Sequence, residues 1–199
     1  MEKLWTDSVQ FGKLILKNRV VMSALTRVRC ELDGVPTDLV AEYYAQRAGA
    51  GLILTESAAI SQIGYGFPGQ ACLFNKAQAE GWKKVIHDVH KKNAKIICQI
   101  FHAGRVTHPE FNGQTETWAP SAVQNREKIK DLGGIDYPLP KAVTKEDIET
   151  LKKEYDNAFY LAKEAGFDGI QLHGSFGYLI DEFLRSYTNR RTDEYGGSA

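Results

Sequence analysis

The chain has 199 residues, of which 43% are hydrophobic, so it can bury a substantial core and we expect a globular protein. Its 25 basic and 25 acidic residues balance, which gives no reason to expect nucleic acid or an anionic membrane as a partner. No apolar run approaches the roughly 20 residues that span a bilayer, and the N-terminal stretch MEKLWTDSVQFGKL does not have the charge order of a signal peptide. The three cysteines are widely spaced, so we expect a reduced, cytoplasmic protein.

Short apolar runs alternate with amphipathic segments along the chain. Four runs rich in β-branched residues predict strands covered on both faces, at residues 18–25, 51–57, 94–101 and 168–173. Three amphipathic segments predict helices between them, at residues 37–51, 80–93 and 144–166. Thr37 and Thr144 are the expected N-caps of the first and third helices, and Gly166 is the expected stop of the third. The order β-α-β-α-β-α-β predicts a parallel sheet, either open and doubly wound or closed into a barrel.

A glycine-rich stretch helps to choose between these two architectures. GYGFPG at residues 64–69 fits the pattern GxGxxG, but it does not form the turn from a strand into a helix, and Pro68 lies inside it. A dinucleotide site needs such glycines at a helix N-terminus, where they contact pyrophosphate. We therefore interpret residues 64–69 as a loop and favour the barrel. Residues 103–143 are rich in Pro, Gly and Asn, and predict a long loop insert after the third strand.

The predicted barrel is incomplete. A (β/α)8 barrel takes about 250 residues, whereas the pattern here supplies four β/α units. We expect residues 1–199 to form the N-terminal half of such a barrel, with the C-terminal half absent. An exposed strand edge would then favour self-association through the edge of the half-barrel.

The stretch QLHGSFGYLIDEFL, residues 171–184, holds the strongest candidates for chemistry. His173 ends a predicted strand, and the C-terminal ends of strands face the active site in barrels. Tyr178 follows a turn flanked by Gly174 and Gly177, which allow the backbone to approach a flat ligand. A phenol is a plausible proton donor to a basic carbon. The structural alternatives are a core histidine bonded to a carbonyl and a packed tyrosine.

The motif HGSFGYLIDEFL, followed by NRRTDEYGGS, resembles the signature of the Old Yellow Enzyme family of FMN-dependent ene-reductases, which are (β/α)8 barrels. NRVVMSALTRVR, PTDLVAEYYAQRAGAGLILTES and CQIFHAGRVTHPEFNGQ resemble earlier segments of that family in the same order. The agreement is close with the oxophytodienoate and maleimide reductase branch. It covers the N-terminal half of the family's length.

The resemblance implies roles for individual residues. The family's Pro-Leu-Thr, which meets the flavin, reads Ala24-Leu25-Thr26 here, with Thr26 expected at the flavin O4 edge and the turn less preset without proline. Ser57 stands against the ring, and Gln99 bonds its pyrimidine edge. Without the resemblance, Gln99 would be only a polar residue in a buried strand that needs a partner.

On the substrate side, the resemblance implies that His173 contacts both flavin and substrate carbonyl, and that Tyr178 protonates the α-carbon. Phe101, Phe176 and Tyr178 are expected to contact the substrate together with His173. Phe176 departs from the family, which has a second His or Asn donor at this position. Because losing one oxyanion donor typically costs ~10²–10³ in rate, we expect a bias towards more electrophilic alkenes or quinones. In the structural alternative, Phe176 points away and packs under the turn.

The resemblance thus implies an oxidoreductase in which NAD(P)H reduces FMN and the flavin then reduces a small activated alkene or quinone. The phosphate site of a barrel flavin follows strands 7 and 8, which lie beyond the sequence, so we expect weak FMN binding by this chain alone. One alternative is the barrel part of a dienoyl-reductase-type enzyme with FAD and iron–sulfur portions. Another is a catalytically inert half-barrel. His87 and His90 have i, i+3 spacing, but no third ligand follows, so no metal site is predicted.

Overall fold

The computed structural model describes residues 4–113 and 116–197. The chain divides into two compact units. Unit 1 comprises Met1–Ala58, Gly69–Ile100 and Asn157–Leu172, and unit 2 comprises Ala59–Pro68, Phe101–Asp156 and His173–Ala199. The predicted loop insert and the motif that begins at His173 both fall in unit 2, whereas the predicted strands lie almost entirely in unit 1.

Unit 1 is built on a four-stranded sheet with the strand order β10-β5-β4-β3. The strands are β3 (Val21–Met22), β4 (Leu52–Ala59), β5 (Lys95–Phe101) and β10 (Gly169–Leu172). β3 pairs with β4 in parallel, and β10 pairs with β5 in parallel with Leu172 opposite Ile100. All four predicted strands are therefore present, and the parallel sheet is confirmed.

The first predicted strand, residues 18–25, is much too long, because only Val21 and Met22 join the ladder. Beyond Met22 the chain leaves the backbone of β4. The Arg27 N–H donates to the carboxyl group of Glu56 at 3.0 Å instead of to a β4 carbonyl. A side chain thus replaces the neighbouring strand as the hydrogen-bond partner, which an apolar pattern cannot reveal.

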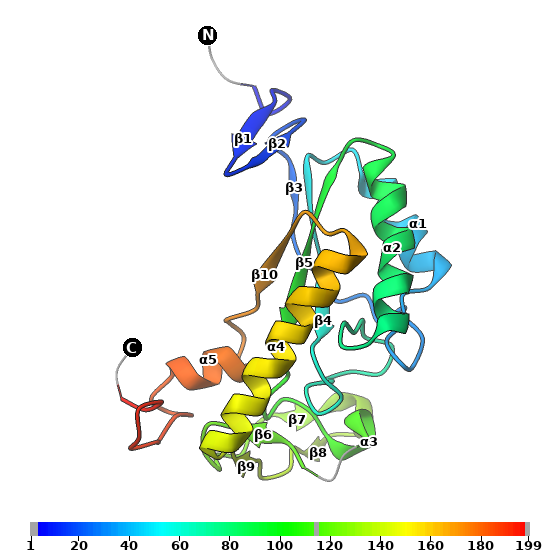
Figure 1. Ribbon diagram of the computed structural model, residues 1–199. Helices are drawn as coiled ribbons and strands as arrows, with labels where there is room; N and C mark the ends of the chain where they lie inside the picture. The colour runs from blue at the N-terminus through cyan, green and yellow to red at the C-terminus, as the bar shows by residue number, and fades with distance from the viewer. Residues whose placement is uncertain (1–3, 114–115, 198–199) are drawn as a thin grey trace. The chain divides into compact units, whose positions relative to one another are not determined.

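Two helices of unit 1 lie side by side, as Figure 1 shows for α1 (Asp38–Arg47) and α2 (Lys76–His90). Thr37 caps α1 as predicted, since its side chain accepts from the Val40 N–H. α2 begins four residues before the predicted start, because Asn75 and Gln78 form a reciprocal capping box. The third predicted helix is α4 (Lys145–Ala165), where Thr144 accepts from the Asp147 N–H at 3.1 Å. Gly166, at φ +96°, follows its end.

The core of unit 1 lies between these helices and the sheet. Trp82 of α2 is fully buried, and its indole N–H donates to the Cys72 carbonyl at 3.1 Å. The ring packs against Tyr44 and Phe167, with centroids 6.2 Å and 5.3 Å away. A large aromatic group with its polar atom satisfied contributes several kcal/mol to the stability of a core.

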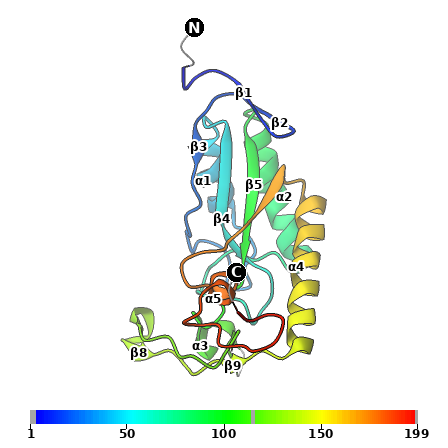
Figure 2. The same ribbon diagram turned by 90° about the vertical axis from the view of Figure 1, so that its left-hand side faces the viewer.

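An N-terminal hairpin of unit 1 was not predicted. β1 (Val9–Phe11) pairs antiparallel with β2 (Leu14–Leu16), and the turn between them contains Gly12 at φ +58°. The hairpin lies at the end of the sheet where the strands begin (Figure 2). Its strands are only three residues long and mostly exposed, so the hydrophobic period is too short to recognise.

Unit 2 contains the insert, which is a loop with short ordered pieces. They are α3 (Pro109–Asn112), the parallel pair β6 (Trp118–Ala119) and β9 (Lys141–Ala142), the antiparallel pair β7 (Lys128–Ile129) and β8 (Ile135–Asp136), and the 3₁₀ turn η1 (Lys130–Leu132). α5 (Leu179–Leu184) follows the motif at His173. A small core joins Val143, Ile148, Leu151 and Leu179. The predicted insert is therefore not structureless.

Three sequence-based expectations concern surface and thiol chemistry. Within residues 4–113 and 116–197, no helix is long and apolar enough to cross a membrane. Cys30, Cys72 and Cys98 are buried free thiols. His87 is exposed, and the Nε2 atom of His90 lies 2.8 Å from a carboxylate oxygen of Asp168.

Candidate active site

Three polar side chains form a hydrogen-bonded row across the sheet of unit 1, which we call the polar row: Ser57 of β4, Gln99 of β5 and Gln171 of β10. The Ser57 hydroxyl donates to the side-chain oxygen Oε1 of Gln99. The side-chain nitrogen Nε2 of Gln99 donates to the side-chain oxygen Oε1 of Gln171 at 2.8 Å. The backbone register places Gln171 opposite Gln99. These bonds fix which end of the Gln99 amide is the donor and which is the acceptor.

Gln99 retains capacity for a ligand. A glutamine amide has two N–H donors and an oxygen with two lone pairs, and the described partners use one of each. The side chain is partly exposed, and its backbone N–H is held by the Thr55 hydroxyl at 3.1 Å. A fixed, partly exposed amide with a spare donor and acceptor suits the edge of a planar heterocycle with alternating donors and acceptors.

The segment Ala24-Leu25-Thr26 follows β3 in an extended loop. Leu25 and Thr26 are exposed, and among the described residues the Thr26 hydroxyl has no recorded hydrogen-bond partner. No described contact joins this segment to the polar row. The predicted role of these three residues therefore stays a prediction.

Three rings form a second group, in unit 2, which we call the aromatic cluster: Phe101, His173 and Tyr178. The centroids of His173 and Tyr178 are 4.9 Å apart with an interplanar angle of 87°. Phe101 lies 5.0 Å from Tyr178, again edge to face, and 6.1 Å from His173. Edge-to-face packing is the preferred geometry of aromatic pairs, so the imidazole and the phenol are held next to each other.

Burial shifts the pKa values of both polar rings towards their neutral forms. It lowers the pKa of His173, which favours a neutral imidazole, and it raises the pKa of Tyr178, which keeps the phenol protonated. The Nδ1 atom of His173 is buried and has no hydrogen-bond partner among the described residues. A neutral imidazole with an unsatisfied ring nitrogen, next to a protonated phenol, can bind an oxygen and deliver a proton.

The turn between the two rings is fixed by Asp181 of α5. Its carboxylate accepts from the Gly177 N–H at 2.7 Å and is bonded to Arg185 at 2.9 Å. Phe176 and Gly177 both have left-handed backbone angles, φ +61° and +77°. Phe176 is 81% exposed, and its ring lies 6.0 Å from that of His173. An exposed ring does not fit the structural alternative in which Phe176 packs under the turn.

A buried carboxyl group orders the loop that follows Phe101. Glu182 is fully buried and accepts from the Arg105 N–H at 2.9 Å, and burial raises its pKa to about 8. A Cβ atom at Gly104 would lie 2.3 and 2.6 Å from the two Glu182 carboxyl oxygens, so only glycine fits there. The Leu179 N–H donates to the His102 carbonyl at 3.1 Å. These contacts tie the start of α5 to the segment that carries Phe101.

Each unit therefore assembles part of the predicted site: unit 1 joins Ser57 to Gln99, and unit 2 joins Phe101, His173, Phe176 and Tyr178. Sequence reasoning missed Gln171, Asp181 and Glu182. Gln171 carried the same signal as Gln99, a polar side chain in a buried strand. Asp181 and Glu182 gave no comparable signal, because acidic residues in the first turn of a helix are common.

Polar and aromatic side chains lie on the strands of a parallel α/β sheet and directly after them, and the comparisons with known proteins name the family. Residues 7–199 match the NADH:flavin oxidoreductase / NADH oxidase family. The chain belongs to this family.

Named relatives support the same conclusion. Flavin oxidoreductase hxnT of Emericella nidulans is 44% identical over the whole chain and 52% of its own length. 12-oxophytodienoate reductase 7 of Oryza sativa is 40% identical over 95% of the chain and 49% of its own length. A probable flavin mononucleotide-dependent alkene reductase of Leishmania infantum is 41% identical. The chain spans about half the length of these relatives.

Solved structures show the fold. The Old Yellow Enzyme homologue from Zymomonas mobilis superposes with a TM-score of 0.92 at 42% identity, over 98% of this chain and 55% of that one. Morphinone reductase in complex with tetrahydroNAD gives 0.91 at 38% identity, over 99% and 56%. The predicted fold class, the first four β/α units of a barrel, is confirmed by these matches.

Proposed function

We propose that this chain carries the substrate-facing half of an FMN-dependent reductase, which uses NAD(P)H to reduce the C=C bond of activated alkenes such as enones, quinones and maleimides. The observation that carries the proposal is the edge-to-face contact of His173 and Tyr178, 4.9 Å between centroids, directly after β10. Family membership and the oxophytodienoate and alkene reductases among the relatives support it.

The two rings have complementary tasks. In its neutral form, His173 offers a ring N–H to the substrate carbonyl oxygen, where negative charge develops during reduction. Tyr178, protonated throughout the neutral pH range because burial raises its pKa, donates its proton to the α-carbon. Phe101 supports both rings by edge contacts. The pair therefore supplies the polarising group and the acid within one packed cluster.

The flavin would be held by unit 1. Gln99 has a spare amide donor and acceptor, Ser57 fixes its orientation, and the Thr26 hydroxyl is exposed for a further bond. When bound, FMN supplies the hydride for the β-carbon. The spare hydrogen-bonding capacity of Gln99 is the feature of the protein that fits an isoalloxazine edge.

Phe176 favours substrates that are already strongly electrophilic. A phenylalanine cannot donate to the carbonyl oxygen, so of the two positions from which the family donates only His173 carries a donor here. A single donor stabilises the developing charge less than two, and substrates that are already electrophilic need less stabilisation. Maleimides and quinones should therefore react faster than simple enones.

The test follows flavin absorbance. The purified chain is mixed with FMN and separated from free flavin, and bound flavin is titrated with NADPH and NADH and then with N-ethylmaleimide. The proposal expects bound flavin that bleaches with a reduced nicotinamide and recovers its colour with the alkene.

A chain that stays colourless with added FMN would support the inert half-barrel instead. A second experiment adds a separately produced C-terminal half of a relative. It distinguishes a chain that lacks only the flavin phosphate site from a chain whose aromatic cluster is inactive. Colour and turnover restored by that half support the proposal, and bound flavin without alkene reduction contradicts it.

A further inference from the structure

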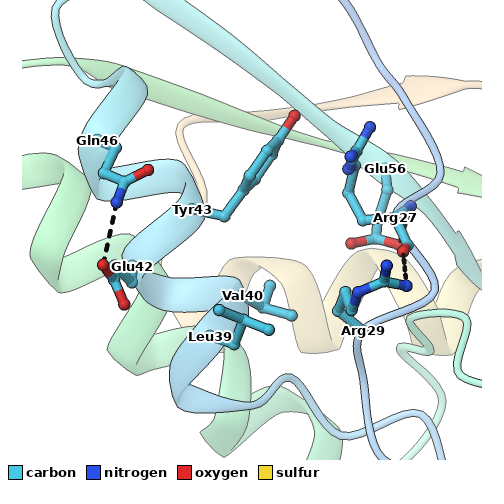
Figure 3. A pocket seen from close by; sticks show the side chains of 8 residues that line it. All are labelled: Arg27, Arg29, Leu39, Val40, Glu42, Tyr43, Gln46 and Glu56. Carbon is cyan, nitrogen blue, oxygen red and sulfur yellow. Dashed lines mark hydrogen bonds between the residues drawn. The ribbon is translucent and has the colours of Figure 1, made fainter.

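A cavity of unit 1 shares no residue with the polar row. It has a volume of about 210 Å³ and lies between α1 on one side and the segment 27–29 with the end of β4 on the other (Figure 3). We call it the Glu56 cavity. The lining residues that matter below are Arg27, Arg29, Leu39, Val40, Tyr43 and Glu56.

The carboxyl group of Glu56 is rigidly held, and one of its two oxygens has no partner among the described residues. The residue is fully buried, Oε2 accepts from the Arg27 N–H at 3.0 Å, and the backbone N–H of Val28 also contacts the carboxyl group. The backbone N–H of Glu56 bonds the Tyr44 hydroxyl oxygen at 2.7 Å. Oε1 is buried without a partner among the described residues, and Figure 3 shows the carboxyl group directed towards the space beside α1. An unsatisfied buried carboxyl oxygen is costly, so a ligand that satisfies it gains that energy.

The charges around the cavity favour a ligand whose hydrogen-bond donor is neutral rather than cationic. Arg27 and Arg29 both line the cavity, and both guanidinium groups interact electrostatically with Glu56. A cationic ligand would therefore meet two like charges next to the carboxyl group. A neutral hydroxyl can donate to Oε1 without that repulsion.

Arg29 is the group that would bind an acidic ligand end. It is exposed, and its Nη1 atom donates to the backbone carbonyls of Arg27 and Val28 at 3.0 and 3.1 Å. These bonds hold the guanidinium in place and leave its other N–H groups for a carboxylate. Arg27 is engaged differently, because its guanidinium carbon lies 4.9 Å from the centroid of the Tyr43 ring.

The apolar wall and the size select the body of the ligand. Leu39 and Val40 present two aliphatic side chains from α1. Tyr43 adds a ring over which Arg27 and Arg47 lie at 4.9 and 3.7 Å from the centroid. A cavity of about 150 Å³ accommodates a benzene ring, so 210 Å³ holds one substituted ring. Flavins and dinucleotides are too large for this space.

We propose that the Glu56 cavity binds a single-ring phenolic acid: the hydroxyl donates to Glu56 Oε1, the ring packs on Leu39 and Val40, and the carboxylate pairs with Arg29. The proposal does not depend on the reductase function, because it uses no residue of the polar row or the aromatic cluster.

The experiment titrates the 199-residue chain with 4-hydroxybenzoate and with benzoate, followed by calorimetry and by amide chemical shifts. A hydrogen bond to a carboxylate predicts that 4-hydroxybenzoate binds at least about tenfold more tightly than benzoate. The shift changes should concentrate in residues 27–29, 39–46 and 56. No binding at millimolar concentrations, equal binding of the two acids, or shifts located elsewhere would overturn the proposal.

Variants separate the two ends of the ligand. Glu56→Gln keeps the shape but replaces the carboxyl group by a neutral amide, which bonds a phenol more weakly, so it should reduce the preference for 4-hydroxybenzoate and leave benzoate binding unchanged. Arg29→Ala should weaken both acids equally, and Arg126→Ala, at an exposed arginine of unit 2, should change neither. If Glu56→Gln fails to fold, the benzoate comparison on the wild-type chain and Arg29→Ala still decide.

Discussion

The polar row of unit 1 and the aromatic cluster of unit 2 hold their functional groups in different ways. Gln99 is held by side-chain hydrogen bonds from both sides, which fix its orientation while leaving one donor and one acceptor site for a ligand. His173 and Tyr178 are held by ring packing and by the Asp181-capped turn, and they keep unsatisfied polar capacity. The row is suited to holding a ligand of fixed shape, whereas the cluster is suited to exchanging protons with a changing one.

The largest expected effect concerns the proton donor of the aromatic cluster. Tyr178→Phe keeps the ring contacts with Phe101 and His173 but removes the acid, and general acid catalysis contributes roughly 10²–10⁴ in rate. Reoxidation of the reduced flavin by an alkene should slow by that factor, while its reduction by NADPH should be unchanged. Stopped-flow absorbance in the flavin-loaded complex measures both half-reactions.

The matched control is Tyr160→Phe, which removes a phenol from the exposed surface of α4 and should leave both half-reactions as they are. Equal slowing of both half-reactions by Tyr178→Phe would mean that the residue is structural rather than an acid.

The next effect concerns the buried carboxyl group of Glu182, whose raised pKa should make the free energy of unfolding depend on pH. Burial raises the pKa of Glu182 from 4.5 to about 8. Between pH 4.5 and 8, the carboxyl group is therefore protonated in the folded state and ionised in the unfolded state. The free energy of unfolding should therefore fall as the pH rises from 4.5 to 8, by up to roughly 1.4 kcal/mol per pH unit. Urea unfolding across this range should show a flatter profile for Glu182→Gln.

The comparison must allow for His102, whose pKa burial lowers from 6.5 to about 3. Its contribution has the opposite sign, since stability is lost as the pH falls below 6.5. It is present in both proteins and cancels in their difference. Glu146→Gln, at an exposed position of α4, should leave the profile unchanged, and a parallel profile for Glu182→Gln would contradict the prediction.

A smaller effect is expected in the polar row. Gln99→Leu preserves the approximate volume but leaves the Ser57 hydroxyl and the Gln171 carbonyl without their described partner. Partly buried groups orphaned in this way cost about 1–3 kcal/mol, which urea unfolding followed by circular dichroism can measure. Gln10→Leu on the exposed face of β1 is the control. A loss no larger than the control's would show that the row does not stabilise the sheet.

The smallest effect concerns Phe176, whose φ of +61° is unfavourable for a bulky side chain. Asparagine tolerates this region better, and the ring is 81% exposed, so Phe176→Asn should stabilise the chain by roughly 0.5–1 kcal/mol. It should also raise turnover of simple enones by adding a carbonyl donor. Phe176→Leu removes the ring but adds no donor, and it should improve neither property. Unchanged or lower enone turnover for Phe176→Asn would count against the single-donor hypothesis.

The sequence predicted what depends on local pattern. Alternating apolar and amphipathic segments were sufficient for the parallel sheet, and Thr37 and Thr144 correctly indicated two helix starts. The position of His173 at a strand end came from the same pattern. Features that depend on one particular side-chain contact could not be predicted. Arg27 bonds to Glu56 instead of continuing β3, and the Gly177 turn depends on Asp181.

Resemblance supplied what pattern could not, since no spacing rule selects Ser57 or Gln99. Their hydrogen bond in the structure is consistent with a shared site, whereas Ala24, Leu25 and Thr26 remain predictions. Gln171 could have been found by asking which partner a polar residue in a buried strand needs. The Glu56 cavity could not, because its walls come from a helix and a loop whose packing the sequence does not specify.

The neighbouring positions of Glu56 and Ser57 make β4 sensitive to a particular kind of change. One side chain contacts the segment after β3, and the next contacts β5. A single-residue deletion earlier in the strand would shift the register, moving Ser57 to the place of Glu56 and Glu56 to that of Thr55, so that both side chains would change faces. One lost codon would therefore remove both contacts at once, whereas a substitution at either position would remove only one.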